Sequence, residues 1–188
     1  TERIIQVGLC KVCDGVVTAR SGWLVRQVVE VPPEARMVHG ITTADIRARG
    51  IPPHESLARL LGVLTTAPMC VGHNIHRFDI LFLIADCRRL GMPVPEFGHF
   101  VDTAAIYKGW KLNMERRPDE TFKKYADRVL ETRAPGLKFS LATCLQFLSI
   151  QTATAQLHQA GDDAFLTHLV FEALKQVVSP ETCACNLR

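Results

Sequence analysis

The sequence predicts an α/β fold in which a mixed β-sheet is flanked by helices on both faces. First, residues 4–12 and 16–31 are strand-like and are separated by an Asp14-Gly15 turn, so the chain opens with antiparallel strands. Second, after residue 53, apolar residues at helical spacing alternate with short apolar runs, an order typical of α/β sheets. The 188 residues, 47% of them hydrophobic, favour a single domain at residues 1–178 followed by a tail at 179–188.

Local signals predict the elements of the first half of the chain. Pro32 and Pro33 stop the sheet, and Thr43 is expected to cap a short helix. Leucines at helical spacing predict the next helix, and an apolar run predicts a short buried strand after it. The expected elements are a helical turn at 34–38, helices at 44–49 and 57–64, a strand at 67–71 and a helix at 80–90.

The second half continues with a strand that passes into a helix at 100–106 and with helices at 118–131, 140–148 and 162–178. Its segment 108–138 holds nine Lys or Arg against five Asp or Glu, with aromatic residues interleaved. Such a segment can follow a nucleic-acid backbone and stack bases. A solvated helix with an apolar stripe explains the same pattern and is the favoured interpretation.

Composition narrows the class of protein only a little. A net charge of +3 is compatible with a polyanionic partner but does not demonstrate one. Seven cysteines, several in apolar runs, indicate reduced thiols rather than a disulfide framework, so we expect an intracellular location, nucleus or cytoplasm. A weaker hypothesis is zinc bound by Cys10 and Cys13 or by Cys183 and Cys185. No apolar run reaches the roughly 18 residues of a membrane span, so no membrane association is expected.

Two stretches combine a carboxylate with polar neighbours at the start of a helix. In the first, residues 72–78 lead from a strand into a helix that begins near Asp79. In the second, His158 lies just before a helix, and Asp163 falls in the early turns of that helix. Each aspartate alone is explained as a helix cap or a partner of the helix dipole.

The order of the landmarks resembles that of the DEDDh 3′–5′ exonucleases, the DnaQ-like branch of the ribonuclease-H-like superfamily. The similarity covers residues 1–174 and rests on several segments in sequence order. These are residues 4–8, His39-Gly-Ile-Thr42, the N-x-x-x-F-D motif of Asn74 to Asp79, Val101-Asp-Thr103, Ser140-Leu141 and the H-x-A-x-x-D motif of His158 to Asp163.

The resemblance implies a ribonuclease-H-like sheet and a hydrolase with two divalent cations, Mg²⁺ or Mn²⁺, held by four carboxylates. Asp79 and Asp163 would be metal ligands, and His158 would be the general base. Asp102 matches a family position outside the metal set and is expected to be structural. The implied substrate is the 3′ end of single-stranded DNA or RNA. The residues expected to contact it are Asn74 and Phe78, which shape the site, and His39, Gly40 and Ile41, which lie near the terminal nucleotide.

The sequence departs from the family at its first motif, because no Asp-x-Glu occurs anywhere in it. That motif lies on a central strand, so the expected sheet has a gap and the site lacks two of its four carboxylates. Three explanations stay open: the chain is a fragment, it is a degenerate member, or another strand or a partner chain fills the gap. The alternative function is accordingly an inactive exonuclease-like domain that binds nucleic acid or protein.

Overall fold

The computed structural model describes residues 3–151 and 159–183. By its internal contacts the chain divides into two compact units. The first unit comprises residues 1–66, 82–95 and 154–165, and the second comprises residues 67–81, 96–153 and 166–188. Two helices, α4 and α8, contribute residues to both units.

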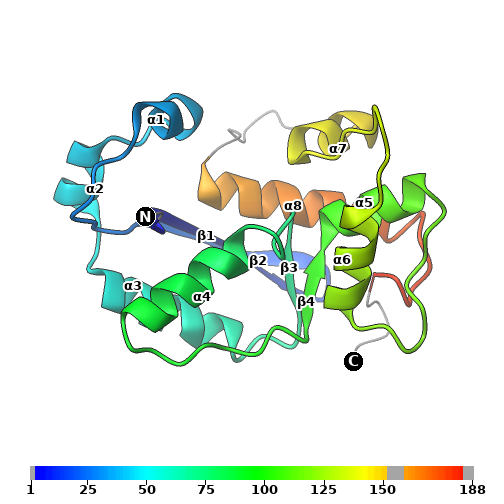
Figure 1. Cartoon of the computed structure of the whole chain (residues 1–188), viewed down its shortest axis with the longest axis horizontal. Coiled ribbons are helices and arrows are strands. Elements are labelled where there is room, and N and C mark those ends of the chain that lie inside the picture. Colours follow the sequence, from blue (N-terminus) through cyan, green and yellow to red (C-terminus); the bar gives the residue numbers. More distant parts are fainter. Residues whose placement is uncertain (1–2, 152–158, 184–188) are drawn as a thin grey trace. The chain divides into compact units, whose positions relative to one another are not determined.

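The first unit is built on an antiparallel hairpin of β1 (Gln6–Cys13) and β2 (Val16–Leu24), drawn in blue in Figure 1. Asp14 and Gly15 have φ values of 50° and 76°, so the Asp-Gly pair makes the predicted two-residue turn. Residues 16–31 were expected to form one or two strands, but strand structure in this range ends with β2 at Leu24. Val25 instead makes a single parallel bridge with Ile51.

The helices of the first unit are short. They are α1 (Pro33–His39), α2 (Thr43–Arg49) and α3 (Pro53–Leu64), joined by most of α4 (Asp79–Arg89). The prediction that Thr43 caps α2 is wrong by one residue. Thr42 is the cap, because its hydroxyl accepts from the backbone N–H of Asp45 while the Asp45 carboxylate accepts from the N–H of Thr42, a reciprocal capping box.

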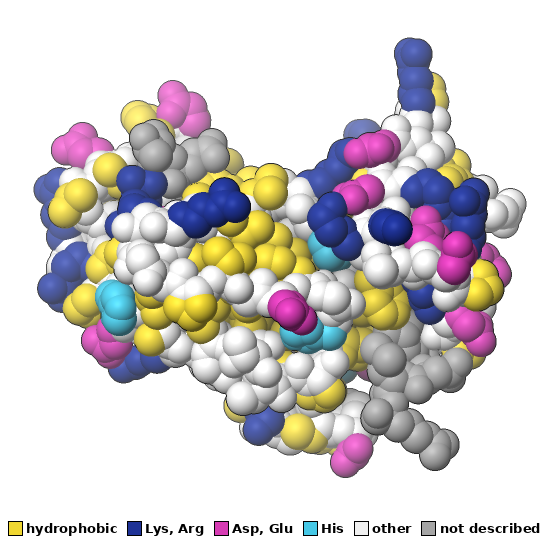
Figure 2. Space-filling view, turned by 60° about the horizontal axis from the view of Figure 1, so that its bottom comes forward, with side chains coloured by type: hydrophobic (Ala, Val, Ile, Leu, Met, Phe, Trp, Pro, Cys, Tyr) yellow, Lys and Arg dark blue, Asp and Glu magenta, His cyan; other side chains and the backbone are white. Residues whose placement is uncertain are grey.

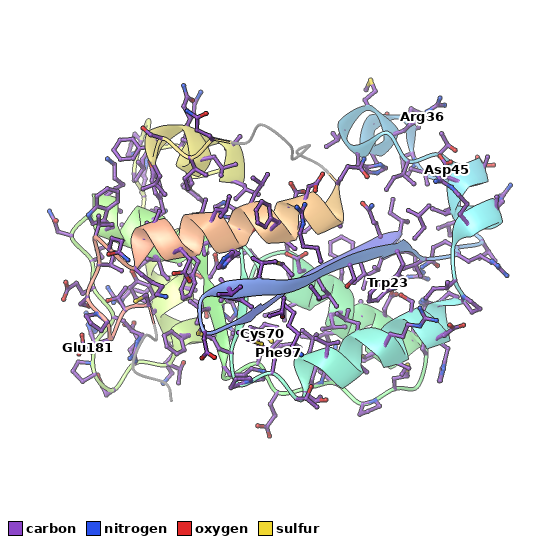
Figure 3. The ribbon with its side chains drawn as sticks, turned by 180° about the vertical axis from the view of Figure 1, so that it is seen from behind. Trp23, Arg36, Asp45, Cys70, Phe97 and Glu181 are labelled. Atoms are coloured by element: carbon purple, nitrogen blue, oxygen red, sulfur yellow. The ribbon has the colours of Figure 1, made fainter. Side chains whose placement is uncertain are left out.

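The core of the first unit lies between the hairpin and α3. Leu57, Leu60 and Leu61 are buried on α3, as their helical spacing predicts. Trp23 lies between the hairpin and this helix (Figure 3), and its indole N–H donates to Ser56 Oγ at 2.7 Å. The bond satisfies the one polar atom of a large apolar side chain, so Trp23 packs without an unpaired donor.

The second unit contains two short parallel strands, β3 (Cys70–Gly72) and β4 (Phe100–Asp102). Its helices are α5 (Thr103–Lys111), α6 (Phe122–Glu131), α7 (Leu141–Phe147) and the later part of α8 (Ala160–Leu174). The helix predicted to start at Pro118 starts at Phe122, because the hydroxyl of Thr121 caps it by accepting from Lys124 N–H. The predicted cap of α7, Ser140, is confirmed.

The described strands form two separate two-stranded sheets, one antiparallel and one parallel. Strands and helices together confirm the predicted α/β class with mixed strand directions. Among the described residues, no strand pairs the β1–β2 hairpin with β3 or β4. The single domain expected at residues 1–178 stays a prediction.

Within the described part of the chain, no helix has the length and apolar character needed to cross a membrane. Five of the described cysteines are free thiols: Cys10, Cys13, Cys70, Cys87 and Cys144.

Candidate functional site

The turn that leads to Asp79 is held by a buried carboxylate, Asp102, at the end of β4. Its Oδ1 accepts from the backbone N–H of Asn74 at 2.8 Å, and its Oδ2 accepts from that of His76 at 3.3 Å. The same Oδ1 accepts from Ala104 N–H at 2.9 Å and so caps α5. Asp102 therefore joins two segments about thirty residues apart in sequence, which supports the structural role expected for it.

His73 fixes the other side of this turn. Its Nε2 lies 2.9 Å from the carbonyl oxygen of Phe139, and its Nδ1 lies 2.9 Å from the hydroxyl of Thr103. A carbonyl only accepts, so His73 Nε2 carries a hydrogen and donates to Phe139, while the Thr103 hydroxyl also donates to the Gly72 carbonyl oxygen at 3.2 Å. Burial lowers the pKa of His73 below its usual value, and this effect outweighs the opposing charge of Asp102.

Three predicted site residues follow one another on this turn. Asn74 has a φ of 59°, a left-handed conformation that asparagine tolerates better than most residues. Phe78 is 58% exposed, an unusual position for a large apolar side chain. Asp79 is the first residue of α4, as predicted. The second unit thus places Asn74, Phe78 and Asp79 in one locked strand-to-helix connection.

The other motif lies in the first unit, where α8 begins directly against the hairpin. A Cβ added at Gly8 would lie 2.0 Å from the backbone carbon and oxygen of Ala160. Gly22 on β2 is the register partner of Gly8, and a Cβ added at Gly22 would lie 3.8 Å from the Cα and N atoms of Gly161. Glycine at position 8 therefore permits the first turn of α8 to approach the strand backbone.

Two adjacent aspartates, Asp162 and Asp163, lie in that first turn, and the first of them contacts the hairpin. Asp162 forms an ion pair with Arg20 of β2, whose guanidinium also lies 4.2 Å from the centre of the Phe165 ring. The ion pair gives Asp162 a role in attaching α8 to the hairpin. The assignment of Asp163 as a metal ligand stays a prediction from the H-x-A-x-x-D motif. The predicted base, His158, lies outside the described residues.

The predicted segment near the terminal nucleotide, residues 39–41, begins at the last residue of α1. Gly40 has a φ of 73° and its N–H donates to Arg36 O, so it ends α1 in the left-handed conformation common at helix C-termini. His39 Nδ1 accepts from Ile41 N–H at 3.0 Å, and Ile41 is buried. The His39 carbonyl in turn accepts from Gln159 Nε2 at 3.1 Å.

The predicted site residues therefore form two groups, each within one unit. Asn74, Phe78 and Asp79 belong to the second unit, whereas residues 39–41 and Asp163 belong to the first. Sequence analysis missed Gln6, Arg20 and Gln159. Gln159 could have been suspected because it stands inside the H-x-A-x-x-D motif, but nothing in the sequence pairs Gln6 or Arg20 with α8.

The basic segment at 108–138 uses several of its charges internally. Lys108 is 3% exposed, and its ammonium donates to the carbonyls of Leu130 and Thr132 at 2.9 and 2.7 Å. Arg128 pairs with Glu120 at 2.7 Å. On the face drawn in Figure 2, Lys and Arg side chains are interspersed with Asp and Glu. These contacts favour the structural interpretation of the segment over a nucleic-acid track.

The donor set suits hard cations only in part. Asp79 and Asp163 supply the oxygen ligands that Mg²⁺ and Mn²⁺ prefer. Within residues 3–151 and 159–183, however, no group of three or more His, Cys, Asp or Glu could hold a metal ion. Cys10 and Cys13 belong to no such group, and the other suggested zinc pair includes Cys185, which lies outside the described residues.

Comparison with known proteins identifies the family. The family model described as exonuclease of the RNase T type matches residues 1–171, and the chain belongs to this exonuclease family, which is DnaQ-like and ribonuclease-H-like. The fold class and the family expected from the sequence motifs are thereby confirmed. A search of curated proteins finds no match.

Solved exonucleases share the fold at low sequence identity. Escherichia coli exonuclease I in complex with a dA16 oligonucleotide has a TM-score of 0.72 and 17% identity, over 96% of this chain and 38% of that one. Exonuclease X in complex with 5′ overhanging duplex DNA has a TM-score of 0.58 and 16% identity, over 96% of this chain and 89% of that one. The zinc-bound form of an E. coli exonuclease I complex with single-stranded DNA matches with a TM-score of 0.66 and 18% identity, over 86% and 34% of the two chains. The chain spans less than two fifths of the length of the exonuclease I chains.

Proposed function

We propose that this protein is a metal-dependent 3′–5′ exonuclease that removes nucleotides from single-stranded 3′ ends. The observation that carries the proposal is that both motif aspartates stand in the first turn of a helix whose approach is fixed by specific hydrogen bonds. Asp102 and His73 fix the turn before Asp79. The contacts of Gly8 and Gln6 with Ala160 fix the turn that holds Asp163.

In this proposal each residue has a distinct role. Asp79 and Asp163 would each be a carboxylate ligand of a divalent cation, and the cations would supply an activated water and neutralise charge on the scissile phosphate. His158 would act as the general base that accepts a proton from the attacking water. Residues 39–41 hold the terminal nucleotide, with Asn74 and the exposed ring of Phe78 shaping the site. Family exonucleases generally use divalent metals, and the nucleic acids named in the matched structures are DNA with single-stranded regions.

Efficient two-metal chemistry needs more carboxylates than these two. Because the sequence contains no Asp-x-Glu, the proposed activity is conditional on a strand that supplies this motif from an added segment or from a partner chain. The experiment therefore uses two preparations: the chain alone, and the chain with an Asp-x-Glu strand added before Thr1.

The assay follows a 20-nucleotide single strand labelled at its 5′ end, with Mg²⁺, Mn²⁺ or EDTA. A 3′–5′ exonuclease yields a ladder of products that shortens with time and disappears with EDTA. We expect Asp79→Asn, Asp163→Asn and His158→Ala each to lower the rate at least about 100-fold, the scale of losing a positioned catalytic group. Asp127→Asn, which removes an exposed ion pair with Lys123, is the matched control and should keep the wild-type rate.

Equal rates for the control and the three site variants would overturn the assigned residues. Degradation that persists in EDTA would overturn the metal dependence. Release of mononucleotides from the 5′ end first would overturn the direction of cleavage.

The second candidate function is an inactive exonuclease-like module that binds nucleic acid. The absence of Asp-x-Glu from the sequence is the observation that favours it. If the protein is such a module, its affinity for an oligonucleotide falls as the salt concentration rises and does not depend on divalent metal. Neither preparation then cleaves the oligonucleotide. Cleavage by the preparation with the added strand would contradict this second candidate function.

A further inference from the structure

A chain of amide hydrogen bonds in the first unit connects the last residue of α1, His39, with the first turn of α8. Gln159 Nε2 donates to the His39 carbonyl at 3.1 Å, and Gln159 Oε1 accepts from Gln6 Nε2 at 3.4 Å. Gln6 Oε1 completes the chain by accepting from Ala160 N–H at 3.2 Å. The four groups come from three separate stretches of sequence.

The direction of this chain is fixed by its two ends. The His39 carbonyl only accepts and the Ala160 N–H only donates, so each glutamine must present its oxygen on one side and its nitrogen on the other. Turning either amide over would bring two acceptors or two donors together. The two side chains therefore hold one another in a single orientation, and neither can change without breaking a bond of the other.

Gln159 also contacts the metal-ligand turn through its backbone. Its carbonyl oxygen accepts from the N–H of Asp162 at 2.9 Å and from that of Asp163 at 2.8 Å. One residue thus binds Asp163 through its main chain and His39 through its side chain. A displacement of residues 39–41 would pull on the carbonyl that orders the backbone of Asp163.

The segment at the other end is equally constrained. Gly40 holds a left-handed φ of 73°, and His39 Nδ1 accepts from Ile41 N–H. These contacts fix the direction of the His39 carbonyl, so the bond to Gln159 depends on the conformation of residues 39–41. A ligand that changes the conformation of residues 39–41 would therefore also affect the first turn of α8.

We propose that Gln159 is a positioning residue that couples the segment 39–41 to the turn that holds Asp163. The inference rests on the proposed function for its meaning, because residues 39–41 are there assigned to the terminal nucleotide and Asp163 to the metal. Binding of the 3′ nucleotide to residues 39–41 would then order the turn that holds Asp163. The nucleotide would raise the affinity for the metal, and the metal would raise the affinity for the nucleotide.

Hydrogen exchange at the backbone amides of Asp162 and Asp163 tests the coupling without nucleic acid or activity. Gly40→Ala strains the left-handed position and disturbs residues 39–41. We expect it to speed exchange of both amides about fivefold, the scale of one net hydrogen bond. In a Gln159→Met background, which keeps side-chain length but removes the amide, Gly40→Ala should have no further effect on these amides.

Two controls separate the coupling from general loosening of the fold. Gly91→Ala introduces the same kind of strain at a φ of 63° in the same unit, and should leave the Asp162 and Asp163 amides unchanged in every background. Gln159→Glu keeps the acceptor for Gln6 but loses the donor to His39, so at pH 7 it should uncouple as fully as Gln159→Met. An equal effect of Gly40→Ala with and without Gln159, or no effect in the wild type, would overturn the coupling.

A second arm connects the coupling to the proposed function. The affinity of a short single strand is measured with and without Mn²⁺ in the wild type and in Gln159→Glu. A metal-dependent gain that shrinks about fivefold in the variant supports the coupled site. If Gly40→Ala speeds amide exchange only when Gln159 is present, but nucleic-acid affinity does not depend on metal, the proposed nuclease function alone is overturned. If the effect of Gly40→Ala does not depend on Gln159, the role of Gln159 alone is overturned.

Discussion

Gly8→Ala tests whether the close approach of α8 to the hairpin is a necessary part of the fold. The added Cβ would lie 2.0 Å from the carbon and oxygen of Ala160 and 2.4 Å from Gly161 N, well inside the 3.0 Å below which something must shift. All three atoms belong to the backbone, so no side-chain rotation can relieve the overlap. The first turn of α8 must move away from β1.

The expected cost follows from two terms. Overpacking of this kind costs about 1–3 kcal/mol, and separating Ala160 N–H from Gln6 adds about 1 kcal/mol for the lost hydrogen bond. We therefore expect Gly8→Ala to lower the free energy of unfolding by roughly 3 kcal/mol. The change would also loosen the turn that holds Asp163.

Gly62→Ala is the matched control, because it makes the same chemical change within α3 where nothing lies within 4 Å of the added atom. Alanine is favoured over glycine inside a helix by about 1 kcal/mol, so this variant should be more stable than the wild type. Urea unfolding followed by circular dichroism and tryptophan fluorescence measures both variants. If Gly8→Ala unfolds at the same urea concentration as Gly62→Ala, the close approach of α8 to β1 is wrong.

Two further predictions concern buried polar groups of the second unit. Lys108→Met removes the ammonium that donates to two backbone carbonyls and should lower the free energy of unfolding by about 2–3 kcal/mol. The control Lys124→Met, at an exposed position of α6, should change it by less than about 0.5 kcal/mol. Comparable urea midpoints for the two variants would contradict the buried role of Lys108. For His73, burial lowers the pKa in the folded state, so the unfolded chain binds the proton more readily. The stability due to the neutral ring is then complete above the unfolded value of about 6.5 and is lost as the pH falls from there through the lowered folded pKa. Urea midpoints measured between pH 7.5 and 5.5 should fall less steeply for His73→Gln than for the wild type, and parallel profiles would show that His73 does not titrate in this way.

The sequence by itself determined the features that depend on neighbouring residues. Asp14 and Gly15 form a turn because both can adopt positive φ, and α3 follows from leucines at helical spacing. The positions of Asp79 and Asp163 at helix starts were predicted for the same reason, because cap and turn residues act within one helical turn. Thr42 shows that even a missed cap was present locally, as the spacing Thr-x-x-Asp of a capping box.

Only the tertiary structure decided which polar residues act together. The H-x-A-x-x-D spacing distinguishes Asp163 from its neighbour Asp162, but nothing in the sequence pairs Asp162 with Arg20, which lies 142 residues away. Gln6 and Ala160 are separated by 154 residues, and their bond exists because glycine at position 8 lets α8 approach the strand. Lys108 resembles a surface charge in sequence but is buried beneath the end of α6, where two carbonyls satisfy it. Hydrogen bonds and ion pairs of this kind depend on distance in space, which local periodicity and capping signals do not encode.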